Sequence, residues 1–300
     1  MRRWAHRTHL AGLLLFAAAA CGRGSRSAPS GGLTVTDDAG RAVVLAQPAR
    51  RIVSLSPGVT ELLFALGAGD RVVGRTTWCD YPPAARAVPS VGDGLNPNIE
   101  AVAARHPDLV VLYRSALNET AAAQLARLGL AAVLVQQDRL EDLARTARLL
   151  GRLTGADATG DSLAQVLERF ASGPRPPPRA RVAFVVWDNP PVVIGGGSYL
   201  DQLAALAGAA NVFHDIGSAS AQVGLETIVT RDPDVVVVLR DSAGPPPEPP
   251  GFTRRPEWRA VRAVRQRRFV YLTGSLFGRP SPRAPQAVAE FRRRLEEATR

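Results

Sequence analysis

Few residues of this chain have the types and spacing that metal binding or catalysis requires. Outside the first 21 residues there are two histidines, His106 and His214, and one cysteine, Cys79, all far apart. Transition-metal sites need clustered His and Cys ligands, for example H-E-x-x-H on a helix, and no such pattern occurs. No pair of carboxylates stands out for acid–base catalysis. We therefore expect no metal site and no catalytic residues.

The glycine-rich segments also lack the residues that nucleotide chemistry needs. A dinucleotide site requires G-x-G-x-x-G directly after the first strand, but SPGVTE follows RIVSL here. GGGS, residues 195–198, has no following lysine, and all 37 basic residues of the chain are arginines. No G-x-S-x-G elbow stands near a strand end. The pattern favours a binding protein, with an exported α/β enzyme as the alternative.

The net charge of +10 at pH 7 does not by itself indicate a nucleic-acid partner. Nucleic-acid-binding proteins gather basic residues into patches, commonly with aromatic side chains among them. The arginines of this chain are scattered along the sequence instead. We expect no nucleic acid as a partner.

One short pattern occurs twice in the chain. NIEAVAARHPDLVVL (98–112) and GLETIVTRDPDVVVV (224–238) share Glu, Arg, Pro, Asp and two Val in register, 126 residues apart. TELLFALGAGDRVV is repeated more loosely by SYLDQLAALAGAANVF, in the same order. Repeats at this distance are too long for a solenoid unit and indicate two similar domains.

The elements that would position any site alternate between strand and helix. RIVSLS, DRVVG, PDLVVLY, AAVLVQQ, RVAFVVW and RFVYLTG predict strands, and their near-continuous Val and Leu are typical of parallel sheets. The fold class is α/β, with two Rossmann-like lobes at 33–154 and 178–300 and a ligand cleft between them. Residues 155–177 predict a single backbone helix and a Pro-rich linker that join the lobes.

The N-terminal segment predicts export. Residues 1–21 have a basic start and an apolar run about half as long as the ~20 residues of a membrane span. The run ends at Cys21 after Ala18, Ala19 and Ala20, which resembles a lipobox, and polar residues 22–32 would form a flexible tether. We expect a lipid anchor at Cys21 on the extracytoplasmic (periplasmic) side, with an ordinary signal peptide as the alternative. Cys79 alone remains, so no internal disulfide is expected.

Four segments together resemble the class III substrate-binding proteins of ABC importers: RIVSLSPGVTELLFALGAGDRVVG, WCDYPPAA, NPNIEAVAARHPDLVV and PPVVIGGGSYLDQLAALAGAANVF. DYPP followed by NPNIE is most similar to the cobalamin-binding branch. The resemblance implies a monomer that holds cobalamin or a related corrinoid between its lobes and delivers it to a permease. It implies no cofactor other than this ligand.

The resemblance also implies ligand-contacting positions. Trp78 and Tyr113 match aromatic cleft positions, and the loop 273–283 matches another ligand-contacting loop through Ser275, Leu276, Phe277, Gly278 and Arg279. Trp187, after RVAFVV, is added because strands of such sheets end at the cleft. Two further aromatic positions of the cobalamin branch are occupied here by Gly92 and Ser220.

In the family, one glutamate on each lobe pairs with arginines of the two permease subunits, which work with an ATPase. The matching residues are Glu100 and Glu226, the repeated glutamates of the pattern above. Each is predicted near a helix start, where the helix dipole favours a carboxylate. Stabilisation of their own helices is the alternative role.

Other ligands of the same superfamily remain open. Haem would require an axial Tyr or His, for which Tyr81, Tyr113 and Tyr199 are candidates. An anionic ferric siderophore would require converging arginines, for which Arg114 and Arg279 are candidates. A surface interaction protein that uses GPPPEPPG, residues 244–251, is a third class of function.

Overall fold

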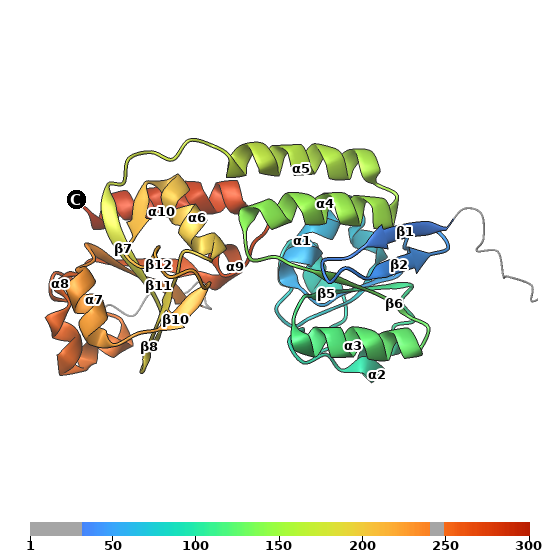
Figure 1. Cartoon of the computed structure of the whole chain (residues 1–300), viewed down its shortest axis with the longest axis horizontal. Helices are drawn as coiled ribbons and strands as arrows, with labels where there is room; N and C mark the ends of the chain where they lie inside the picture. The colour runs from blue at the N-terminus through green and yellow to red at the C-terminus, as the bar shows by residue number, and fades with distance from the viewer. Residues whose placement is uncertain (1–31, 241–248) are drawn as a thin grey trace, which may run out of the picture. The chain divides into compact units, whose positions relative to one another are not determined.

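The computed structural model describes residues 32–240 and 249–300, so the predicted signal segment, the tether up to residue 31 and most of the segment 244–251 lie outside the described residues. The described chain forms two α/β lobes with separate sheets, as the sequence predicts (Figure 1). No helix among the described residues is long and apolar enough to cross a membrane.

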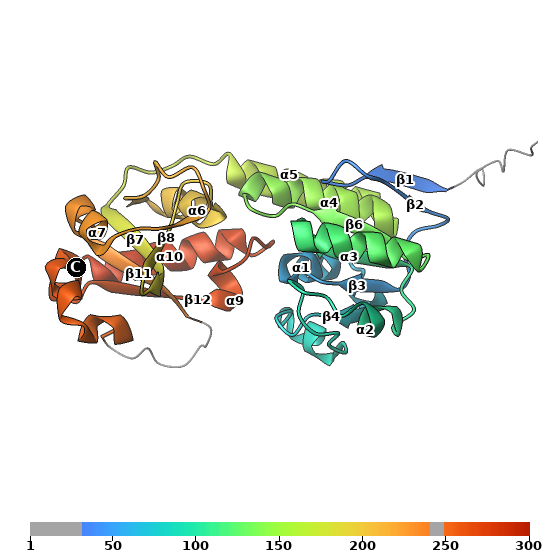
Figure 2. The ribbon, with the colours of Figure 1, turned by 60° about the horizontal axis from the view of Figure 1, so that its bottom comes forward.

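The first lobe is built on a parallel four-stranded sheet with strand order β4-β3-β5-β6. Its elements are β1 (Leu33–Thr36), β2 (Ala42–Leu45), β3 (Ile52–Ser54), α1 (Pro57–Ala65), η1 (Gly69–Arg71), β4 (Val72–Arg75), η2 (Pro83–Ala87), α2 (Ile99–Ala103), β5 (Leu109–Tyr113), α3 (Ala116–Arg127), β6 (Ala131–Val135) and α4 (Leu140–Thr154). Helices α1 and α4 pack on one face of the sheet, and α2 and α3 pack on the other (Figure 2). Covering both faces explains why the strands are apolar at successive positions.

The second lobe repeats this plan on a larger sheet with order β10-β8-β7-β11-β12 and β9 beside β7. Its elements are β7 (Ala180–Asp188), β8 (Pro191–Ile194), α6 (Tyr199–Ala207), β9 (Ala209–Asn211), β10 (Ser220–Gln222), α7 (Leu225–Arg231), β11 (Val235–Arg240), η3 (Gly251–Arg254), η4 (Pro256–Ala260), α8 (Arg262–Arg265), β12 (Phe269–Thr273), α9 (Gly274–Phe277) and α10 (Ala284–Ala298). Strands β7, β9, β11 and β12 are parallel. Helices α6 and α10 cover one face, and α7, η3, η4 and α8 cover the other.

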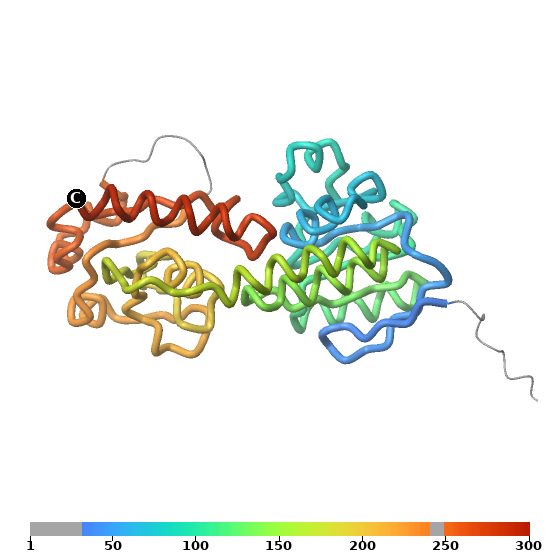
Figure 3. Tube along the Cα trace, turned by 90° about the horizontal axis from the view of Figure 1, so that it is seen from above, coloured from blue at the N-terminus to red at the C-terminus, as the bar shows by residue number. Residues whose placement is uncertain are grey.

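The predicted bridging segment contains one helix, α5 (Asp157–Ala171). Rather than spanning open space, α5 packs back along α4, as the tube in Figure 3 shows. The two helices come close at glycines: a Cβ on Gly151 would lie 3.1 Å from the Cα of Gly160. Arg148 of α4 also pairs with Glu168 of α5. Helix α5 is therefore attached to the first lobe.

The sequence repeat is a structural repeat. Helix α2 and strand β5 correspond to α7 and β11 at the offset of 126 residues. In the first copy, Asp108 accepts a hydrogen bond from the backbone N–H of Arg51, whose guanidinium donates to the carbonyls of Arg105 and His106. His106 has a left-handed backbone, with φ of 47°.

The second copy has the same contacts. Asp234 accepts from the backbone N–H of Arg181, whose guanidinium donates to the carbonyls of Arg231 and Asp232. Asp232 is left-handed as well, with φ of 42°. The Pro-Asp turn thus joins a helix end to a strand in the same way in both lobes.

Asp37 joins the β1–β2 hairpin to the first sheet, and its loss should destabilise the fold. Its buried carboxylate accepts hydrogen bonds from Arg41 and from the backbone N–H of Leu134. Burial raises the pKa of Asp37, but the hydrogen bonds from Arg41 and Leu134 outweigh it and leave the pKa below its ordinary value. We expect Asp37→Asn to lower the free energy of unfolding by about 1.5–3 kcal/mol at pH 7.

Because the folded-state pKa of Asp37 is lowered, its contribution is present above the unfolded pKa of about 3.9 and is lost as pH falls through the folded value. Urea unfolding of wild type and Asp37→Asn at pH 7 and near pH 3 should show the difference between them shrinking in acid. Asp70→Asn, at an exposed acid of η1, is the control. An equal difference at both pH values would contradict this account.

Candidate ligand cleft

Two adjoining cavities, of about 240 and 360 Å³, lie where strand ends of the two lobes meet. They share Pro57, Trp78, Gly278 and Arg279, and we call them together the cleft. Loops that follow β3, β4, β5 and β6 line it from the first lobe, and the loop after β12 lines it from the second. The carboxyl ends of parallel strands are the usual ligand-binding edge of α/β sheets.

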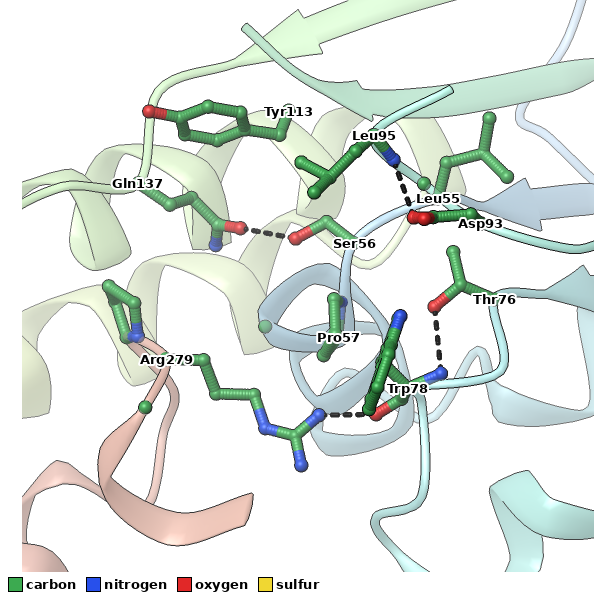
Figure 4. A pocket seen from close by; sticks show the side chains of 14 residues that line it. Leu55, Ser56, Pro57, Thr76, Trp78, Asp93, Leu95, Tyr113, Gln137 and Arg279 are labelled. Atoms are coloured by element: carbon green, nitrogen blue, oxygen red, sulfur yellow. Dashed lines mark hydrogen bonds between the residues drawn. The ribbon is translucent and has the colours of Figure 1, made fainter. Parts of the chain in front are cut away.

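Five of the eight predicted ligand residues line this cleft. They are Trp78, Tyr113, Ser275, Gly278 and Arg279. Figure 4 shows Trp78, Tyr113 and Arg279 around one of the two cavities. The side chain of Trp78 is 62% exposed, although large apolar side chains are usually buried. Its indole therefore offers an apolar face to a flat ligand.

Phe277 and Leu276 do not line the cleft, contrary to the prediction. Phe277 is 1% exposed and packs its ring edge-on against Phe291 of α10, with 6.4 Å between ring centroids. Leu276 packs on the same core. The reason is the short helix α9, which turns these two side chains inward and leaves Ser275 and Arg279 facing the cleft.

Trp187 lies at the predicted sheet edge but outside the two cavities. It follows Val185, which pairs with Val238, and so stands at the same C-terminal edge as Thr273. Its side chain is 61% exposed, and its indole N–H donates to the carbonyl oxygen of Asn189 at 2.9 Å. It is free to present a ring face near the rim of the second lobe.

Leu95 was missed by the sequence reasoning. It is 67% exposed and lines the cleft opposite Trp78, three residues after Gly92, where the cobalamin branch has an aromatic residue (Figure 4). Gly92 has φ of 102°, a conformation that disfavours any side chain. An apolar residue within the polar loop GDGLNPN was the available signal. Ser220, the other departure, is exposed on β10.

A buried ion-pair network beside the cleft joins the lobes, and it too was missed. Glu61 of α1 is 3% exposed and accepts two hydrogen bonds from the guanidinium of Arg283, at 2.6 and 2.7 Å. Arg279 lies 3.7 Å from Glu61 and also pairs with Asp80. Nearby, a Cβ on Gly58 would lie 2.3 Å from the carbonyl oxygen of Pro280, so the lobes touch closely here.

Tyr113 is held as a protonated hydrogen-bond donor. Its hydroxyl donates to Asp138 at 2.7 Å. Burial and this carboxylate raise the pKa of Tyr113 to about 12, because both disfavour the phenolate. Beside it, Ser56 donates to the side-chain carbonyl of the buried Gln137. The cleft floor thus presents neutral polar groups.

The other two tyrosines considered for haem do not face the cleft. Tyr199 is 3% exposed at the start of α6. The ring of Tyr81 lies under the guanidinium of Arg283, at 3.9 Å. No group of three His, Cys, Asp or Glu side chains among the described residues could hold a metal ion. Cys79 is fully buried, with its sulfur 3.2 Å from Thr76 Oγ1.

Glu100 and Glu226 occupy equivalent, exposed positions of the two lobes. Each is the second residue of its helix, α2 or α7. Asn98 caps α2 by accepting a hydrogen bond from the backbone N–H of Ala101, so Glu100 is not needed as a cap. The N-cap of α7 is Gly224, which has no side chain to cap the helix, and Glu226 lies exposed beside it.

Comparison with known proteins defines the class. Residues 52–276 match the family model described as periplasmic binding protein, and the chain belongs to this family. An uncharacterized ABC transporter substrate-binding lipoprotein, YvrC of Bacillus subtilis, is 27% identical over 275 residues, which cover 86% of this chain and 84% of YvrC. The vitamin B12-binding protein of Vibrio cholerae is 25% identical over 251 residues, 81% of this chain and 88% of that protein.

Solved structures agree on the two-lobe fold. The periplasmic heme-binding protein RhuT from Roseiflexus sp. RS-1, in its apo form, superposes with a TM-score of 0.71 at 26% identity. The match covers 84% of this chain and all of that chain.

Proposed function

We propose that this protein is the substrate-binding subunit of an ABC importer and that its cargo is cobalamin or a related corrinoid. Family membership and the relative named as vitamin B12-binding support the class and the ligand. The observation that carries the proposal is the exposed indole of Trp78 on a cleft formed by both lobes. The protein binds its cargo without altering it and needs no cofactor of its own.

The same cleft is less suited to haem, the ligand named for the RhuT structure. Haem iron bound by a tyrosine requires the phenolate oxygen. Tyr113, the one tyrosine that lines the cleft among the described residues, would have to give up its hydrogen bond to Asp138 to bind iron. A corrinoid requires flat apolar contact and hydrogen bonds to amides, which Trp78, Leu95 and Ser275 can supply.

The proposed partners follow from the same assignment. Glu100 and Glu226 would contact arginines on the two subunits of a permease dimer, one from each lobe, with the ATPase below. Opposite charges on this protein and on the permease would orient the two proteins and speed their association. The protein would act as an exported monomer, and Cys21, outside the described residues, would carry the lipid anchor.

Calorimetry with cyanocobalamin tests the proposal. Residues 22–300 should bind one cyanocobalamin per chain, and Trp78→Ala should weaken binding about tenfold or more, because a stacked aromatic face of this kind contributes about 1.5 kcal/mol. Leu128→Ala, an exposed leucine of the first lobe outside the cleft, should leave affinity unchanged. No heat and no corrin absorbance that co-elutes with the protein would overturn the ligand.

A further inference from the structure

The charged side chains that line the cleft carry a net negative charge, although the protein as a whole is positively charged. The residues that line its two cavities include two carboxylates, Asp80 and Asp93, and one guanidinium, Arg279. The lining side chains thus have one negative charge more than positive, whereas the whole chain has a net charge of +10. An anionic ligand would meet repulsion here unless Arg279 were free to pair with it.

Arg279 is not free in this structure. Its Nε donates to the carbonyl oxygen of Ser275 at 3.0 Å, and Nη1 donates to the carbonyl oxygen of Trp78. Its Nη2 donates to Asp80 and to the Ser275 hydroxyl. The side chain is 13% exposed, so a competing anion would have to displace Asp80 and not merely add to it.

Glu61 places a second negative charge beside Arg279. Its carboxylate lies 3.7 Å from Arg279 and pairs fully with Arg283, so two acids and two arginines neutralise one another. Arg283 meets Glu61 in a two-point contact, the strongest guanidinium–carboxylate geometry. Arg279 contacts Asp80 through Nη2, and its other N–H donors go to carbonyl and hydroxyl oxygens, so few of its donors are left for a further carboxylate. An uncharged amide, by contrast, could accept a hydrogen bond from an Arg279 N–H group that already donates to the protein, without displacing Asp80.

We propose that Asp80 determines specificity: it occupies Arg279 and so makes the cleft select an uncharged, amide-bearing face of the ligand over a carboxylate-bearing one. This inference rests on the proposed binding function and adds to it the chemical class of the recognised groups. Asp80 comes from the first lobe and Arg279 from the second, so the selection is made where the two lobes meet.

The test compares two corrinoids, cyanocobalamin and the same corrinoid after hydrolysis of its peripheral amides to carboxylates. Wild type should bind the amide form at least tenfold more tightly. Asp80→Asn should reduce that preference about tenfold, because Arg279 becomes available to a carboxylate. Asp93→Asn is the matched control: it removes one charge from the same cleft, but its carboxylate accepts from the backbone N–H of Leu95 and not from an arginine.

The outcomes separate this inference from the proposed function. Equal shifts for Asp80→Asn and Asp93→Asn, or a wild-type preference for the carboxylate form, would overturn the role of Asp80 while leaving corrinoid binding in place. Failure of wild type to bind either corrinoid would overturn the ligand. Citrate then tests Asp80 without any cargo: Asp80→Asn should bind it at least threefold more tightly than wild type or Asp93→Asn, and equal affinities would overturn the inference.

Discussion

Replacing Glu61 by alanine should lower the free energy of unfolding by about 3–5 kcal/mol, the usual cost of removing one partner of a buried ion pair. The guanidinium of Arg283, whose side chain is 13% exposed in the intact protein, would lose its carboxylate partner, and Arg279 would lose a neighbouring negative charge. In the intact protein the pKa of Arg283 is raised, because the hydrogen bond and charge of Glu61 outweigh the effect of burial. Urea denaturation at pH 7 would measure the change.

Two further variants show whether the cost comes from the unpaired arginine. Glu61→Leu combined with Arg283→Met should recover much of the lost stability, because apolar groups can replace a buried pair. Glu168→Ala removes an acid from the exposed pair between α4 and α5 and should change stability only slightly. A double variant as unstable as Glu61→Ala would show that the pair itself is not the cause.

Removing both Glu100 and Glu226 should reduce transport at least tenfold and leave cargo binding unchanged. Both carboxylates are exposed at helix starts, and neither lines the cleft. Loss of two complementary charges would slow docking to the permease and shorten its lifetime. Uptake of labelled cyanocobalamin into vesicles that hold the permease and ATPase would measure transport, and calorimetry would measure cargo affinity.

Asp157→Ala is the control for this double variant, because Asp157 is an exposed acid in the first turn of α5. It should have no effect on uptake. A loss of cargo affinity in Glu100→Ala/Glu226→Ala would place these residues in ligand binding instead. A raised salt concentration should lower the wild-type docking rate more than that of the variant, since exposed charges are screened.

The sequence predicted the two-lobe fold because its signals are local and repeated. The Pro-Asp turns before β5 and β11, and the continuous Val runs that follow them, fix a helix end and a buried strand in each lobe. The loop residues after strands also indicated a shared edge, which is why Trp78, Tyr113 and Arg279 meet.

What the sequence could not predict are contacts between distant segments. Glu61 and Arg283 are 222 positions apart, and nothing local marks either as buried. The inward turn of Phe277 depends on one turn of helix whose apolar side meets α10. Leu95 reaches the cleft through a loop that Asn118 of α3 holds by a hydrogen bond to the carbonyl oxygen of Gly94. Such placements are decided by tertiary packing rather than by the pattern along the chain.

The packing of α5 on α4 has a mechanical consequence. Because the glycines at their crossing and the Arg148–Glu168 pair bind α5 to its neighbour, α5 cannot swing independently. The backbone between Ser172 and Arg179 is the connection that must bend if the angle between the sheets changes, and it contains four prolines. Prolines restrict the backbone to few conformations. A change in the angle between the sheets would therefore be concentrated in this short segment, where the prolines leave few backbone angles free to change.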